Sequence, residues 1–169
     1  MMMIDRIEDW IDATNRAFLP KRQSCVRFAQ AFSGYFPLAF LEEAGFVMVD
    51  RIPKPDFPQL RQLGIDDLLE LAAAGVTYKT TYYLLSAQSR SLRLHFHELV
   101  HVAQWRLLGG PGFIARYLAE IRCHGYADAP LEKMAYALET RYVDNAPAFD
   151  VPTEVRRQLS SVGRRGRPR

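Results

Sequence analysis

Apolar residues recur at helical spacing in several stretches of the chain. Between residues 4 and 18 they lie three and four positions apart with acidic residues between them, which predicts an amphipathic helix that ends before Pro20. The same periodicity predicts five further helices, over residues 22–32, 65–74, 91–108, 113–123 and 131–143. Helices therefore dominate the second half of the chain.

Two stretches have the composition of β-strands. Residues 45–49 form a short apolar run, and residues 76–85 are rich in threonine, tyrosine and valine, which favour strands. Three prolines fall within residues 52–60, which predicts an extended loop there. Together the helices and strands predict an α+β fold.

The length of 169 residues fits one domain of ordinary size. We expect this domain to span residues 1–150, with N-terminal helices and a strand over 1–75 and the functional core over 76–145. The composition, 49% hydrophobic and 24% charged, excludes a wholly disordered protein. No apolar run approaches the roughly 18 residues of a membrane span.

The first ten residues contain acidic side chains and do not resemble a secretory signal. The two cysteines, Cys25 and Cys123, are far apart in sequence and form no Cys-x-x-Cys motif. We expect both to be buried, reduced thiols, and the protein to be cytoplasmic. The sequence predicts no particular oligomeric state.

The formal net charge of +3 is unevenly distributed. Six arginines and no acidic residue lie within residues 155–169, so the rest of the chain is slightly acidic. We expect residues 151–169 to be a basic, flexible tail. No aromatic residue separates these arginines, so the tail offers no surface for base stacking and argues against a nucleic-acid partner. A DNA-linked regulator using this tail is retained only as a rival hypothesis.

The motif that carries chemistry is His97-Glu98-Leu99-Val100-His101. On a helix, residues four apart lie on the same face, so His97 and His101 can each give one nitrogen to a single zinc ion. Glu98 projects beside the pair, where it can reach a water but not a third ligand position. This geometry suits a general base. The alternative is an ordinary amphipathic helix whose histidines are bonded to water or carboxylates.

This motif resembles the active-site helix of zincin metallopeptidases. The later segments Gly112-Phe113, Gly125-Tyr126 and Pro130–Tyr136 are similar to small bacterial gluzincins. The resemblance covers roughly residues 76–143. It implies a zincin-like fold, in which a small twisted sheet packs on the active-site helix and a helical C-terminal part completes a Zn²⁺ site.

The resemblance implies that Glu132, on a later helix, is the third zinc ligand. Helices 91–108 and 131–143 can pack side by side, which agrees with this assignment. Glu132 could instead be a first-turn acid that favours the helix dipole. Glu139 lies seven residues later on the same face, so it is either the ligand or the partner of a zinc-bound histidine. Asp128 and Glu120 are weaker candidates.

A metallopeptidase also needs a donor for the oxyanion that forms when water attacks an amide. Tyr126 and His124, in the turn before helix 131–143, are our candidates. Tyr117 and Tyr136 are further options. His95 lies two residues before His97, so it should face away from the metal, at the surface or behind the ligands.

The strand over residues 76–85 could bind substrate by backbone pairing, although it could equally be a plain sheet strand. The sequence thus predicts a zinc-dependent metallopeptidase that acts on a peptide or protein substrate. Its zinc is held by His97, His101 and Glu132, with Glu98 as the base. The alternative is a catalytically silent zincin-like module that binds metal and serves a binding or regulatory role.

Overall fold

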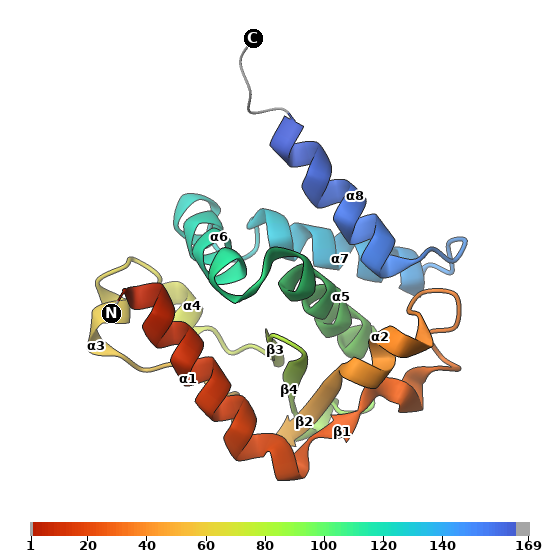
Figure 1. The fold of residues 1–169 in the computed structure, drawn as a ribbon, viewed down its shortest axis with the longest axis horizontal. Helices are drawn as coiled ribbons and strands as arrows, with labels where there is room; N and C mark the ends of the chain where they lie inside the picture. The colour runs from red at the N-terminus through yellow and green to blue at the C-terminus, as the bar shows by residue number, and fades with distance from the viewer. Residues whose placement is uncertain (1, 165–169) are drawn as a thin grey trace.

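A computed structural model describes residues 2–164 of the chain. It contains a four-stranded sheet surrounded by helices, which confirms the expected α+β class (Figure 1). The α-helices are α1 (Met3–Phe18), α2 (Leu38–Glu43), α3 (Pro58–Arg61), α4 (Asp66–Glu70), α5 (Leu92–Leu108), α6 (Gly110–His124), α7 (Pro130–Val143) and α8 (Val151–Arg164). Three short 3₁₀ helices, at Leu19–Lys21, Cys25–Phe28 and Ser86–Gln88, connect elements.

The sheet is mixed, and its strand order is β1-β2-β4-β3. The strands are β1 (Gln23–Ser24), β2 (Gly45–Val49), β3 (Gly75–Tyr78) and β4 (Thr81–Leu85). β2 and β4 are parallel, while β1 and β3 are antiparallel to their neighbours. β3 therefore forms one edge of the sheet.

Helix α5 lies at the centre of the molecule (Figure 1). It packs against β3 and β4 on one side and against α6, α7 and α8 on the others, and all residues from His95 to Trp105 are buried. The Ser91 hydroxyl caps its N-terminus by accepting the Leu94 N–H at 3.2 Å. Gly109, at φ 72°, ends it in a conformation that side chains disfavour. A helix so enclosed holds its side chains in fixed positions.

The bounds of several expected elements agree with the structure to within a few residues. They are the helices over 4–18, 91–108, 113–123 and 131–143 and the strand over 45–49. Among the described helices, none combines the length and the apolar character needed to cross a membrane.

The single strand expected over residues 76–85 is wrong. The chain reverses after Tyr78, so β3 and β4 form a tight hairpin instead. Lys79 adopts φ 62° at the reversal, and its ammonium bonds Glu8 at 2.9 Å and Asp12 at 2.7 Å on α1. These ion pairs hold the turn against the first helix, which a reading of strand periodicity does not reveal.

Two expected helices are also wrong in extent. Residues 22–32 form β1, a 3₁₀ helix and turns, because the Ser24 hydroxyl accepts the Val26 N–H and begins a tighter turn there. The helix expected over 65–74 stops at Glu70, and residues beyond it run extended into β3. The ammonium of Lys54 accounts for that stop, since it binds the carbonyls of Leu68, Leu69 and Leu71.

The flexible tail expected from residue 151 is wrong over residues 151–164, which form α8. Val151 and Val155 are fully buried against the body, so burial of one apolar face holds this helix. Arg157 is not a free cation, because it bonds Glu154 at 2.8 and 3.0 Å. Residues 165–169, with the remaining arginines Arg165, Arg167 and Arg169, lie outside the described part of the chain.

We expect Val155→Ala to lower the free energy of unfolding by about 1–3 kcal/mol, because it removes two buried methyl groups from the α8 interface. Arg156→Ala, on the exposed face of the same helix, is the matched control and should change it by less than about 0.5 kcal/mol. Urea unfolding measures both. Equal effects of the two substitutions would contradict the docking of α8.

Candidate metal centre

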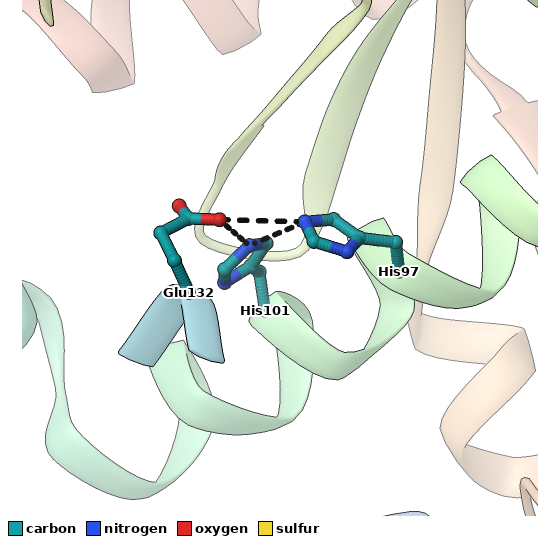
Figure 2. A group of neighbouring side chains, drawn as sticks. All are labelled: His97, His101 and Glu132. Carbon is teal, nitrogen blue, oxygen red and sulfur yellow. Dashed lines mark hydrogen bonds and ion pairs between the residues drawn. The ribbon is translucent and has the colours of Figure 1, made fainter. Parts of the chain in front are cut away.

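Three side chains from two helices meet at one point in the buried interior. His97 and His101 come from α5 and Glu132 comes from α7, and each is no more than 5% exposed. Figure 2 shows their ligand atoms facing one another. The Nε2 atoms of the two histidines are 3.1 Å apart. Glu132 Oε2 lies 3.4 Å from the Nε2 atom of His97 and 3.3 Å from the Nε2 atom of His101. This group can hold a metal ion.

The hydrogen-bond partners of the imidazoles show which nitrogens carry protons. His97 Nδ1 donates to Glu139 Oε2 at 2.9 Å, and His101 Nδ1 donates to Gln104 Oε1 at 2.8 Å. The Gln104 amide is oriented by its own N–H, which binds the Leu131 carbonyl at 3.0 Å. In a neutral imidazole one nitrogen donates and the other accepts. When the two imidazoles are neutral, both Nε2 atoms therefore direct lone pairs into the group.

One oxygen of the Glu132 carboxylate is also held by a hydrogen bond, which leaves the other facing the histidines. Its Oε1 accepts a hydrogen bond from the Tyr117 hydroxyl at 2.7 Å, whereas Oε2 has no hydrogen-bond donor within the described residues although it is buried. Buried polar atoms are nearly always paired, so an unpaired oxygen needs an explanation. Three electron-rich atoms converge here, and a cation among them resolves the repulsion.

Glu139 and the weaker candidates lie outside the group of three. Glu139 accepts hydrogen bonds from His97 and from Arg93. It therefore orients the His97 imidazole, which is the role of a histidine partner that we expected as the alternative to a ligand. Glu120 accepts the Leu131 N–H at 2.8 Å and thereby caps α7. Asp128 is exposed and lies 3.8 Å from Lys133.

Glu98 lies beside the metal group and is only 3% exposed. The Thr77 hydroxyl on β3 donates to Glu98 Oε2 at 2.6 Å. A Cβ atom on Gly75 would lie 2.6 Å from Oε1, so the absence of a side chain at that position makes room for the carboxylate. The edge strand thus holds one carboxylate oxygen of Glu98 through Thr77 and leaves space for the other at Gly75.

The electrostatics of the metal-free group follow from burial and from the opposed charges. Burial alone would lower the pKa of His97, but contact with Glu132 and Glu139 reverses this and raises it to about 10. Burial would raise the pKa of Glu132, whereas His101 and His97 lower it instead. Burial raises the pKa of Glu98 despite the opposing influence of the two histidines. A raised pKa brings this carboxylate closer to the range of a useful base.

Two hollows meet at the group. One is an open cleft of about 420 Å³, bordered by His97, Glu98, Tyr126 and Tyr136. The other, which we call the apolar cavity, has a volume of about 130 Å³ and is bordered on its inner side by Glu98, His101 and Glu132. The apolar cavity is enclosed further out by side chains of α1, α4 and α6, among them Ile11, Leu68, Leu69, Ile114 and Leu118. A molecule in the cleft can therefore reach the group.

The expected oxyanion donors are placed differently from one another. Tyr126 borders both hollows, whereas Tyr136 borders the cleft alone, with its ring 4.5 Å from the His97 ring. His124 is the exposed last residue of α6 and borders neither hollow, so the structure does not bring it to the group. Tyr117 is engaged with Glu132.

Two further expectations need correction. Of the two places expected for His95, the surface is wrong, because the side chain is fully buried, with Nδ1 at 2.8 Å from the Tyr82 hydroxyl and Nε2 at 2.8 Å from the Ser89 carbonyl. Cys25 is buried as expected, but Cys123 is exposed. Cys123 lies near the end of α6, and its side chain is on the exposed face of that helix.

Four residues of the site were missed in the sequence: Gln104, Thr77, Gly75 and Arg93. Gln104 had a usable signal, because it lies three positions after His101 and so on the same helix face. The other three depend on how β3 and α7 pack around α5, and local sequence carries no signal for that.

Comparisons with protein-family models, curated proteins and solved structures find no match to this chain. A function must therefore be inferred from the geometry of the site itself.

The metal-free protein should lose stability as the pH rises from about 6.5 towards 10. The ordinary pKa of 6.5 applies to His97 in the unfolded chain and a pKa of about 10 in the folded one. The folded state thus binds an extra proton in that window, and the free energy of unfolding falls as the proton is released.

Urea unfolding in the presence of a chelator measures this pH dependence. His97→Gln is the control and should remove much of the slope, because it removes the titrating group. A metal-free wild-type protein that gains stability over the same window would show that His97 is not held in its charged form.

Proposed function

We propose that the protein is a zinc-dependent metallopeptidase of the gluzincin type, with a zincin-like arrangement of its sheet and active-site helix. The observation that carries this proposal is the convergence of three potential ligand atoms on one point beside an independently held carboxylate. Two histidines and one glutamate are a ligand set found in catalytic zinc sites, which keep a fourth position open.

The spacing of the ligand atoms supports zinc. Bonds of 2.0–2.1 Å at tetrahedral angles place ligand atoms about 3.3 Å apart. The three observed separations, 3.1, 3.3 and 3.4 Å, are close to that value. The partners of each ligand, Glu139, Gln104 and Tyr117, are hydrogen-bonded as the orienting groups of a metal site are.

The residues of the chain can carry the steps of amide hydrolysis. A bound zinc ion would polarise the scissile carbonyl and make water a better nucleophile at neutral pH. Glu98 takes a proton from the attacking water and passes it to the leaving amine. Tyr126, which borders the cleft beside Glu98, donates its hydroxyl proton in a hydrogen bond to the developing oxyanion.

Glu98→Gln should retain zinc but lower kcat by about 10²–10⁴-fold, because the substitution removes the base and leaves the metal ligands intact. Glu42→Gln, an exposed glutamate on α2, is the control and should leave both properties unchanged. Peptide hydrolysis and zinc content are measured on the same preparations. A wild-type protein that holds zinc but cleaves no peptide of a diverse library would favour the silent metal-binding module.

Glu132→Gln should weaken zinc binding far more than Glu139→Gln. The first loses an ionised ligand oxygen, whereas the second only loosens the His97 imidazole, a change that typically costs 10–100-fold in metal affinity. Competition with a chelator at fixed pH measures both constants, and the pH is fixed because only deprotonated ligands bind. If Glu139→Gln is the more damaging substitution, the assignment of the third ligand is wrong.

A further inference from the structure

Lys54 supplies the single ammonium group in the wall of the apolar cavity. It lies on the loop between β2 and α3, and no arginine or second lysine borders the cavity within the described residues. Its Nζ donates to the carbonyls of Leu68 and Leu69, each at 3.4 Å, and to that of Leu71. These three bonds use all three N–H groups of the ammonium, so a carboxylate would bind by replacing the two long ones, because carboxylates give ammonium groups stronger hydrogen bonds.

The volume of the cavity limits what fits. Cavities of about 150 Å³ lined by leucine, isoleucine and phenylalanine hold a benzene-sized molecule. At about 130 Å³, the apolar cavity accommodates one leucine or phenylalanine side chain but not a long acyl chain. Its inner wall is the metal group itself, so a side chain in the cavity places its own backbone beside Glu98.

We propose that the apolar cavity binds the C-terminal residue of a peptide, with its apolar side chain inside and its free carboxylate on Lys54. An internal residue would bring only neutral amides to this ammonium. This inference rests on the proposed function and makes the enzyme one that releases single apolar amino acids from C-termini. In that reaction the last C–N bond breaks, the hydroxyl of water joins the acyl carbon, and its hydrogen joins the leaving amine.

The test uses binding, so that it does not depend on turnover. N-acetyl-L-phenylalanine resembles the end of an uncleaved peptide, and N-acetyl-L-phenylalaninamide is the same molecule without the charge. The full-length Glu98→Gln protein should bind the acid on the order of tenfold more tightly than the amide in titration calorimetry, because only the acid pairs with the ammonium. N-acetylglycine should bind more weakly than either.

The acid-to-amide ratio then identifies the residue responsible. Lys54→Gln keeps an N–H donor for the α4 carbonyls but loses the charge, and should bring the ratio close to one. Lys54→Arg should retain a preference for the acid. Lys133→Gln removes an exposed lysine that borders neither hollow, and should leave the ratio unchanged. A collapsed loop would weaken acid and amide alike, so the ratio separates loss of folding from loss of recognition.

Repeating the titrations with chelator-treated and zinc-loaded protein separates Lys54 from the metal. A preference for the acid that persists in Lys54→Gln and vanishes on chelation would show that the carboxylate binds zinc, and would overturn the proposal. So would equal binding of acid and amide, or no binding of either, in the Lys54-intact protein. If the preference depends on Lys54 but the wild type hydrolyses no peptide, the proposed activity fails while the carboxylate site stands.

Discussion

The structure depends on a conflict between three buried electron-rich atoms that point at one another. Nε2 of His97, Nε2 of His101 and Oε2 of Glu132 lie within 3.4 Å of each other, and each imidazole already uses its other nitrogen as a donor. Each of the three side chains is no more than 5% exposed, so the repulsion between their lone pairs is only weakly screened. Only a proton or a metal ion between the atoms makes the arrangement favourable.

The surrounding structure holds the conflicting atoms in place from outside. Glu139 and Gln104 fix the two imidazoles, and Tyr117 fixes the carboxylate of Glu132. Gln104 also bonds the first turn of α7, so a single amide sets both an imidazole and the helix that carries the third ligand. Because the polar partners come from α5, α6 and α7, the site is rigid only if these three helices pack together.

Much of this could be predicted from the sequence, for identifiable reasons. The spacing of His97 and His101 is a local property of a helix, and α5 is long and strongly apolar, so both the helix and the pair could be predicted. The residues alone could not decide between Glu132 and Glu139, and only the family resemblance favoured Glu132. Both lie on α7, and its packing against α5 decides which carboxylate faces the two Nε2 atoms and which binds Nδ1 of His97.

Three of the errors have a common physical cause. The chain reverses at Lys79 because its ammonium forms ion pairs with two acidic residues on α1. α4 ends where the Lys54 ammonium binds three backbone carbonyls. α8 forms because its apolar face packs against α5. In each case a contact distant in sequence overrides the local preference, and such contacts are invisible to periodicity.

Gly75 gives the fold a marker that does not depend on the metal ligands. A Cβ atom at that position would lie 2.6 Å from Glu98 Oε1 and 2.9 Å from Leu84 Cδ2, and none of its three nearest atoms belongs to a histidine or to Glu132. A chain of this fold that carries a bulkier residue there would still have a complete ligand set but no room for its base. Position 75, remote from the motif in sequence, therefore offers a way to tell chains built to turn over a substrate from chains built only to hold an ion.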